Sequence, residues 1–389
     1  MKICLHTLYT INKNYIGGVE RFMIKYAKEM KTLGHDVFIV CSSLNKEINI
    51  EGIKVLGIVP QQYIDKYKLY NSSSNFISKE ILNNKYSVEK LRELSNYCLA
   101  QIADIEADIF HFNSFASNLY IPAKKKYFVT NHENEKEYDS KWGVGFFNFM
   151  SSLIKDKKTY LHNYDNLYVP SIYYSELFSK LFDLKISSIK LGIHLEDFQI
   201  TRIGNKNFKE KIKLLFPSRF RMAQKGHIIA LKACKILKDN DFDFEIIFTG
   251  VKEHYKNEVS SFLEKVNFYN LTTEVKIKNY IDIREAYEQC DIVISAERFC
   301  SYGLSISESL SYGIPTFLSA IPTYQEIALN YAHAYFFEPE NPSSLAKAII
   351  DYISNSDTKK INNEMIRFRI NNDLRECAKK YNSIYNSSI

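Results

Sequence analysis

The sequence predicts an α/β protein built from two doubly wound domains that face each other across a cleft. Three observations support this prediction. The 389 residues exceed what one hydrophobic core usually covers. Apolar, strand-like runs alternate with helical patterns along most of the chain, as they do in doubly wound parallel sheets. A polar stretch at 196–209 divides these runs into two series, and we expect a hinge there.

The domain boundaries follow from this division. We place an N-terminal domain at 1–195 and a C-terminal domain at 196–360. The last segment, 361–389, carries a helical pattern with no strand after it. We expect this helix to pack back on the N-terminal domain.

The first domain opens with a βαβ unit. Lys2–Leu8 is a strand of the buried type, and a helix follows Gly17 and Gly18, with Gly34 suited to cap its C-terminus. A strand at 36–41 completes the unit, so we expect a parallel sheet. Further strand-like runs lie at 54–59, 108–112, 126–131, 166–169 and 186–191.

A second series of strand-like runs follows the hinge. These runs lie at 213–217, 244–249, 274–278, 291–296, 315–319 and 334–337. In doubly wound sheets, ligands bind beyond the carboxyl ends of the strands, and here we expect them between the domains.

The composition excludes several classes of protein. A net charge of +6, with acidic and basic residues mixed throughout, is too diffuse for a nucleic-acid binder. The seven scattered cysteines contain no C-x-x-C pair, which indicates reduced thiols and disfavours a disulfide framework or a zinc site. No apolar run approaches about 20 residues, and the N-terminus is too short and polar for a signal peptide. We expect a cytoplasmic protein.

A first candidate site follows the strand at 213–217. Arg219 and Lys225–Gly226 lie between this strand and a predicted helix that starts near His227. Two cations beside a helix N-terminus can neutralise the charge of a diphosphate, because Arg chelates phosphate oxygens and Lys acts as a point charge. The alternative is an ordinary solvated basic loop.

A second candidate site lies in the stretch 300–319. A strand leads into a turn at Gly303, and a short helix that carries Glu308 follows. A glycine turn before a helix exposes backbone N–H groups to a phosphate, and a carboxylate one turn further along can bind a pair of sugar hydroxyls. The alternative is a plain strand–helix connection with Glu308 facing solvent. Both candidate sites lie at strand carboxyl ends of the same predicted domain, and together they predict a nucleotide-sugar pocket.

Two features of the first domain are weaker candidates. Gly17 and Gly18 allow a tight turn and a close ligand, although the GxGxxG fingerprint of a dinucleotide site is missing. His132 would emerge at the carboxyl end of the strand at 126–131, or it is simply a satisfied histidine. For His111 and His194 we prefer structural roles.

The segment 142–158 combines apolar residues with a basic end. Such an element could rest on an anionic membrane surface. The alternative, a helix that packs on the core with one wet end, is the one we favour.

Four motifs resemble a known family. They are GGVE at 17–20, LGIHLEDF at 191–198, SRFRMAQKG at 218–226 and YGLSISESLSYGIP at 302–315. With the two α/β halves, the chain is similar to the family 4 retaining glycosyltransferases, whose GT-B architecture has two Rossmann-like domains across a cleft. The resemblance covers nearly the whole chain, and the second half carries most of the motifs.

The resemblance implies a retaining, metal-independent transfer from a nucleotide-diphosphate sugar, which we expect to be a UDP-sugar, with no separate cofactor. The N-terminal domain would bind the acceptor and the C-terminal domain the donor. By motif position, Arg219 and Lys225 hold the diphosphate and Glu308 holds the ribose. The remaining implied site residues are His132 near the transferred sugar, Gly17 and Gly18 against the donor phosphate and acceptor, and the backbone of Tyr302, Gly303 and Leu304 at the distal phosphate or sugar.

The sequence departs from the family at two positions. The family's first glutamate, eight residues before the second, corresponds to Cys300, and Glu297 lies three residues earlier. Either Cys300 takes that place, or Glu297 does so as a donor-binding residue, which requires a reshaped loop. Ser218 stands where the family usually has glycine, and serine can still form the turn.

Our leading hypothesis is a hexosyl- or N-acetylhexosaminyl-transferase for a cell-surface polysaccharide or glycoconjugate, with a glycan, lipid-linked or protein acceptor. We expect no nucleic-acid partner, and a candidate peripheral contact with the inner face of the plasma membrane through 142–158. The alternatives are a nucleotide-sugar epimerase of the same architecture and a non-catalytic partner subunit.

Overall fold

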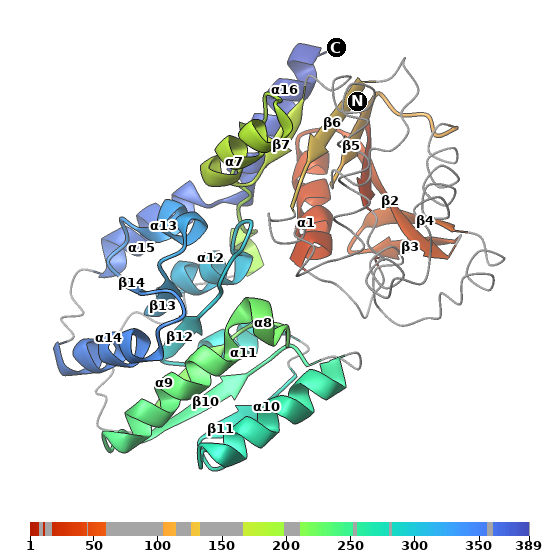
Figure 1. Cartoon of the computed structure of the whole chain (residues 1–389). Coiled ribbons are helices and arrows are strands. Elements are labelled where there is room, and N and C mark those ends of the chain that lie inside the picture. The colour runs from red at the N-terminus through yellow and green to blue at the C-terminus, as the bar shows by residue number, and fades with distance from the viewer. Residues whose placement is uncertain are drawn as a thin grey trace. The chain divides into compact units, whose positions relative to one another are not determined.

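The computed structural model describes residues 1–7, 11, 18–44, 46–59, 104–113, 126–132, 166–197, 211–251, 255–279, 282–355 and 361–388. The chain divides into two compact units (Figure 1). Unit 1 comprises Met1–Leu191 and Leu374–Ile389, and unit 2 comprises Gly192–Asp373. The boundaries expected from the sequence were at 195 and 360, whereas the chain leaves unit 1 after Leu191 and returns to it at Leu374.

Unit 1 contains a largely parallel sheet. Its strand order is β3-β4-β2-β1-β5-β6-β7-β8, and in the described part only β3 and β4 pair antiparallel. The strands are β1 Lys2–Thr7, β2 Asp36–Leu44, β3 Glu47–Ile50, β4 Ile53–Val59, β5 Ile109–Phe112, β6 Lys126–Thr130, β7 Leu167–Val169 and β8 Ser187–Ser188. From β1, the strands β2, β4 and β3 extend the sheet on one side. The strands β5, β6, β7 and β8 extend it on the other side, where β5 pairs directly with β1.

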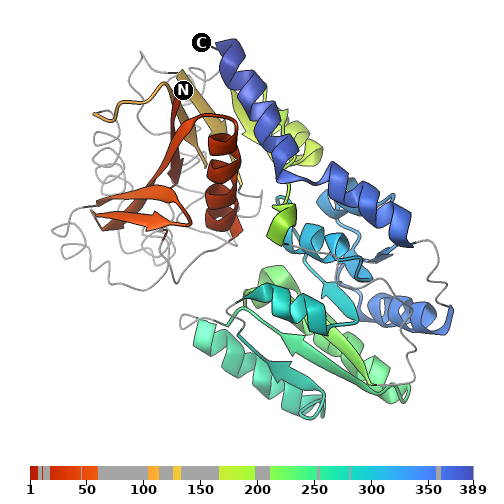
Figure 2. The ribbon, with the colours of Figure 1, turned by 180° about the vertical axis from the view of Figure 1, so that it is seen from behind.

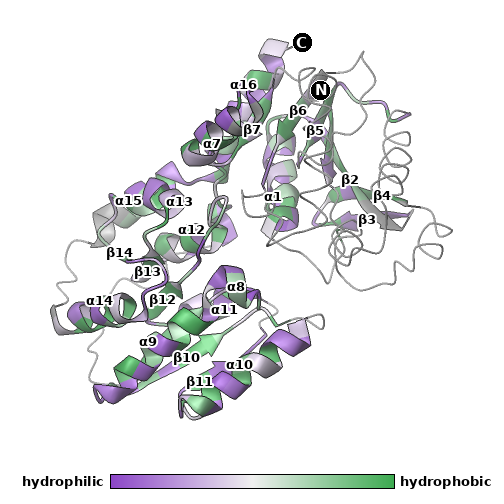
Figure 3. Ribbon diagram, in the orientation of Figure 1, coloured by the Kyte–Doolittle hydropathy of each residue, from purple (hydrophilic) through white to green (hydrophobic). Residues whose placement is uncertain are grey.

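Two helices of unit 1 have clear sequence causes. Helix α1, Gly18–Thr32, buries one apolar face that includes Met23, Ala27 and Met30. Helix α7, Ile172–Phe182, begins where the side chain of Ser171 accepts a hydrogen bond from a backbone N–H of the first turn. In Figure 3, both helices carry hydrophobic and hydrophilic residues.

Unit 2 contains an all-parallel sheet with the order β11-β10-β9-β12-β13-β14. Its strands are β9 Ile212–Phe216, β10 Phe244–Phe248, β11 Val275–Ile277, β12 Ile292–Ser295, β13 Thr316–Ser319 and β14 Ala334–Phe337. This is the doubly wound order of a Rossmann sheet, in which the order reverses between the adjacent strands β9 and β12. The prediction of two doubly wound α/β domains is therefore confirmed.

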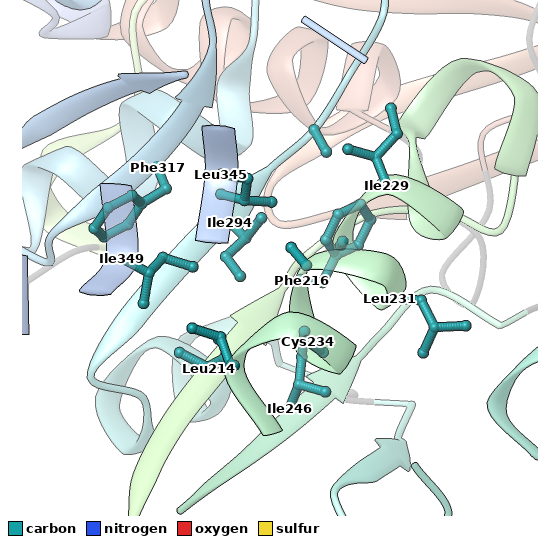
Figure 4. Packing of buried hydrophobic residues seen from close by; sticks show 14 of the residues in the cluster. Leu214, Phe216, Ile229, Leu231, Cys234, Ile246, Ile294, Phe317, Leu345 and Ile349 are labelled. Carbon is teal, nitrogen blue, oxygen red and sulfur yellow. The ribbon is translucent and has the colours of Figure 1, made fainter. Parts of the chain in front are cut away.

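Alternate side chains of the unit 2 strands pack on opposite faces of the sheet. One face holds Leu214, Ile246 and Ile294 under helices α9 His227–Asp239 and α14 Pro342–Asn355 (Figure 4). The other face holds Leu215 and Val293, which pack against helix α11 Ile283–Gln289. Helices α10 Lys256–Phe268 and α13 Pro322–Ala328 complete the connections. Burial on both faces explains why these strands read as continuous apolar runs.

The last helical segment differs from the single helix that we expected at 361–389. The structure has two helices, α15 Ile361–Asn371 and α16 Leu374–Ser388 (Figure 2). Helix α15 belongs to unit 2 and α16 to unit 1. The break lies at Asn372, whose carbonyl accepts a hydrogen bond from the backbone N–H of Ile193 at 2.8 Å. This contact comes from far away in the sequence, so the local pattern does not reveal it.

A buried chain of hydrogen bonds anchors α16 in unit 1. The Tyr381 hydroxyl bonds to the Thr130 hydroxyl, which bonds to Nε2 of His111 at 2.7 Å. The other ring nitrogen of His111 bonds to the Tyr385 hydroxyl, which lies 3.0 Å from the hydroxyl of Tyr26 on α1. Burial lowers the pKa of His111 to about 3, so this ring is neutral at physiological pH. Helix α16 is thus part of the unit 1 core.

None of the helices in the described part of the chain is both long and apolar enough to span a membrane. The candidate membrane segment, 142–158, lies outside the described residues.

Candidate functional site

The candidate site of unit 2 lies where the strand order reverses. Strands β9 and β12 are parallel neighbours, so their carboxyl ends reach the same edge of the sheet. After β9, the chain passes Arg219 and forms the short helix α8, Met222–Lys225. After β12, it passes Glu297 and reaches helix α12, Leu304–Ser311. Ligands of doubly wound sheets bind at this reversal point.

Helix α8 is tied to the loop after β12. The backbone N–H of Arg298 donates to the Gln224 carbonyl at 3.0 Å, and its guanidinium Nη1 donates to the Ala223 carbonyl at 3.0 Å. The Gln224 side chain makes a longer contact with the Phe299 carbonyl, at 3.5 Å. These bonds hold the last turn of α8 against the end of β12.

Gly226 makes this close approach possible. It ends α8 and precedes α9 with φ +74°, in the left-handed region that glycine adopts without strain. A Cβ atom at this position would lie 1.9 Å from the carbonyl oxygen of Ala296. The glycine of the K-G pair is therefore required by packing, whatever ligand the site binds.

Lys225 and Glu297 form a buried ion pair. The Lys225 Nζ lies 2.6 Å from Oε1 of Glu297, and the two side chains are 12% and 2% exposed. The second carboxylate oxygen, Oε2, has no hydrogen-bond partner among the described residues. A buried carboxylate is costly unless a cation accompanies it, so the pair holds Lys225 in one place.

Cys300 carries no charge in this loop. Burial and the neighbouring Glu297 carboxylate raise the pKa of its thiol to about 12. The same two causes raise the pKa of Tyr324, whose hydroxyl lies 3.0 Å from that of Ser295. At neutral pH, Cys300 is therefore a neutral thiol.

Helix α12 begins after Gly303, and no side chain in the described part of the chain caps its N-terminus. Gly303 precedes it with φ +131°, and a Cβ there would lie 3.0 Å from the ring of Tyr324. The positive end of the helix dipole and its first N–H groups suit an anion.

Glu308 lies one turn into α12 and is held in position. Its side chain is 4% exposed, and its Oε2 accepts a hydrogen bond from the Tyr287 hydroxyl at 3.1 Å. The same hydroxyl lies 3.1 Å from the Ser305 carbonyl. The carboxylate is thus oriented rather than solvated, which contradicts the alternative of a solvent-facing Glu308.

The other predicted residues of unit 2 divide into exposed and buried ones. Arg219 is exposed at the start of the loop that leads to α8. The Tyr302 side chain is buried, and its hydroxyl donates to the Asn372 side chain at 3.4 Å. Leu304 packs against the core. At Tyr302, Gly303 and Leu304, the backbone is therefore the part that a ligand could contact.

His132 of unit 1 follows strand β6 and is 8% exposed. The Asn113 amide group donates to the carbonyls of His6 and His111, so its oxygen faces Nε2 of His132 at 3.1 Å. This arrangement assigns the proton of His132 to Nε2. Burial lowers its pKa to about 4, and the ring is neutral at physiological pH.

The two glycines predicted in unit 1 have different outcomes. Gly18 is the first residue of α1, whereas Gly17 lies outside the described residues. Across the described ranges, no group of His, Cys, Asp and Glu is placed to hold a metal ion.

Sequence reasoning missed three residues that organise these sites. Arg298 holds α8, Tyr287 orients Glu308, and Asn113 orients His132. Arg298 directly follows Glu297, but its partners are 75 residues away in the chain. Asn113 had a usable signal, since it directly follows β5, the neighbour of the strand β6 that leads to His132, and polar site residues often lie just beyond strand ends.

Comparison with protein families matches residues 197–368 to the model described as glycosyl transferases group 1. The serotype-specific mannosyltransferase WbdA of Escherichia coli is 27% identical over 135 residues, which are 34% of this chain and 16% of WbdA. The O-antigen biosynthesis glycosyltransferase WclY of Escherichia coli is 27% identical over 197 residues, 48% of this chain and 54% of WclY. The chain thus spans about half or less of these relatives.

A solved structure extends the likeness to the whole fold. The crystal structure of Anabaena HepE in complex with UDP and glucose superposes with a TM-score of 0.71 at 14% identity. The match covers 100% of both chains. The fold of this chain is therefore the GT-B fold with two Rossmann-like units.

Proposed function

We propose that this chain is a retaining glycosyltransferase that uses a nucleotide-diphosphate sugar. The premise is that its residues 197–368 match the family model described as glycosyl transferases group 1. One observation carries the proposal. Lys225 and the uncapped N-terminus of α12, with Glu308 oriented behind it, all lie at the carboxyl edge where β9 and β12 meet.

The proposed donor site has a phosphate end and a nucleoside end. Lys225, Arg219 and the first N–H groups of α12 would neutralise the charge that develops on the leaving diphosphate. Fixed cations of this kind need no metal ion to do so. Glu308 would accept hydrogen bonds from the two ribose hydroxyls through the carboxylate that Tyr287 orients.

The proposed transfer proceeds on one face of the sugar. The bond between the anomeric carbon and the diphosphate oxygen breaks, and a bond from the acceptor oxygen forms on the same face. The proton of the acceptor hydroxyl passes to the departing phosphate oxygen. Neutral His132 would act as a hydrogen-bonding group near the sugar, because its depressed pKa excludes a standing positive charge at neutral pH.

The proposed products are cell-surface polysaccharides or glycoconjugates. The names of WclY and WbdA concern O-antigen biosynthesis and mannosyl transfer. The HepE complex contains UDP and glucose, which supports UDP as the first nucleotide to test. A hexosyl or N-acetylhexosaminyl donor and a glycan, lipid-linked or protein acceptor remain the proposed substrate classes.

The test measures nucleotide binding before turnover. Isothermal titration with UDP, GDP and ADP should show that the wild type binds at least one of them. Lys225→Ala, Arg219→Ala and Glu308→Ala should each raise the Kd of that nucleotide at least tenfold. Lys235→Ala is the matched control, because Lys235 is a partly exposed lysine paired with Asp239 on α9. No binding of UDP, GDP or ADP by the wild type would refute the proposal.

The same protein distinguishes the other functions. Conversion of the donor sugar without any acceptor would indicate an epimerase, and binding or activity only with a second protein would indicate a partner subunit.

A peripheral membrane contact through 142–158 remains a proposal from the sequence. Cosedimentation with vesicles that contain an anionic lipid tests it, and equal recovery with neutral vesicles would remove it.

A further inference from the structure

We propose that Glu297 and Arg298 are positioning residues that together fix Lys225, and that Glu297 is not a ligand of the transferred sugar. This inference rests on the proposed function, since it assigns the role of the residues behind the diphosphate site. Neither residue needs to touch the donor to act in this way.

The two adjacent residues hold α8 by different groups. The Glu297 carboxylate takes the Lys225 ammonium at 2.6 Å. The backbone N–H and the guanidinium of Arg298 bond to two carbonyls at the C-terminal end of the same helix, each at 3.0 Å. One dipeptide at the end of β12 therefore fixes both the side chain and the helix that carries it.

Helix α8 depends on such external contacts. It has four residues, and an isolated turn of this length is not stable in water. A carboxylate of Glu258 accepts a hydrogen bond from the Met222 backbone N–H at its N-terminal end, at 2.8 Å. The Arg298 guanidinium lies at its C-terminal end. A negative group at the N-terminus and a positive group at the C-terminus both stabilise a helix through its dipole.

The charge of Glu297 argues for positioning over binding. Its carboxylate is 2% exposed and directly neutralises the lysine that the diphosphate would need. A negative charge behind Lys225 weakens the attraction for an incoming anion. It also prevents the ammonium from sampling other rotamers, which would cost turnover if the leaving phosphate must meet a fixed cation. Removal of the charge should therefore affect binding and turnover in opposite directions.

The experiment compares three variants of the full chain. Glu297→Gln keeps the shape and removes the charge. Arg298→Met removes the guanidinium, and Arg298→Lys keeps a cation. Glu340→Gln is the matched control, because the exposed Glu340 carboxylate lies 3.4 Å from Nε of Arg298, whereas the bond to α8 comes from Nη1.

Three readouts decide the inference. For Glu297→Gln, we expect the Kd of UDP and the Kd of UDP-glucose either to match the wild-type values or to fall to the same extent. The rate at which UDP is released from UDP-glucose should drop at least tenfold. Amide hydrogen exchange of residues 222–226 should speed up in Glu297→Gln and in Arg298→Met, with partial rescue in Arg298→Lys and no change in Glu340→Gln.

The opposite results are equally specific. A selective loss of UDP-glucose binding, with UDP unaffected, would make Glu297 a sugar ligand and overturn the inference. Unchanged exchange of 222–226 would overturn it as well. The exchange measurement needs no nucleotide, so it tests the clamp even if the wild type binds neither UDP nor UDP-glucose, a result that would instead refute the proposed donor.

Discussion

His227, the first residue of α9, is enclosed by aromatic rings. Its ring centroid lies 4.6 to 6.0 Å from those of Phe216, Phe220, Phe248 and Phe262. The side chain is fully buried, and neither ring nitrogen has a hydrogen-bond partner within the described residues. Burial, assisted by the nearby positive charge of a lysine, lowers the pKa of His227 to about 3. We predict that replacing this ring removes part of the acid sensitivity of unit 2.

The magnitude follows from the difference between the folded and unfolded pKa. An unfolded histidine has a pKa near 6.5 and takes up a proton as the pH falls below that value. The folded ring stays neutral down to about pH 3. The unfolded state therefore binds more protons between these values, and stability is lost as the pH falls through 6.5. At pH 5 this loss is about 2 kcal/mol for one such histidine, and at pH 7.5 it is close to zero.

The assay is urea unfolding of the wild type and His227→Leu at pH 7.5 and pH 5, followed by circular dichroism. The drop in unfolding free energy between the two pH values should be about 2 kcal/mol smaller in the variant. Packing changes cancel in this comparison because they act at both pH values. Ile229→Val is the control, since it should cost about 1 kcal/mol at either pH. Parallel pH dependence of His227→Leu and wild type would refute the reasoning.

Two further predictions concern contacts described above. Tyr385→Phe should lower the unfolding free energy of unit 1 by about 2–4 kcal/mol, because it leaves the Tyr26 hydroxyl and Nδ1 of His111 buried without this partner. Tyr26→Phe should cost less, and a loss below about 0.5 kcal/mol for Tyr385→Phe in urea unfolding would contradict the prediction. Gly226→Ala should cost more than about 3 kcal/mol, since its Cβ would lie 1.9 Å from the Ala296 oxygen at φ +74°; an unchanged Tm with intact nucleotide binding would contradict it.

The fold was largely predictable because buried parallel strands leave a strong local signal. The run at 315–319 matches β13 to within one residue, since all four residues of that strand are buried. Strand β3 was missed because its residues are mostly exposed and it pairs antiparallel at the sheet edge. The division between α15 and α16 was missed because Ile193, which binds the break, lies far away in the sequence.

The candidate site was predictable to the extent that strand ends reveal it. Lys225 and Glu308 each follow a strand within one short loop and helix, so their neighbourhood could be inferred from topology. The partner of Lys225 could not, because Glu297 is 72 residues away and only the fold brings the two together. For the same reason, the sequence could not reveal that burial beside Glu297 keeps the Cys300 thiol protonated.

The hydrogen-bonded anchor of α16 has a consequence for the order in which the protein forms during translation. Unit 1 is discontinuous, because the whole of unit 2 is synthesised between Leu191 and Leu374. While unit 2 emerges from the ribosome, His111 and Tyr26 have no Tyr385 to bond with. Unit 2 is one continuous stretch and can complete its own core first. Unit 1 is therefore the last unit to be completed, and a chain cut short after residue 373 would lack the Tyr385 hydroxyl that bonds to His111 and Tyr26.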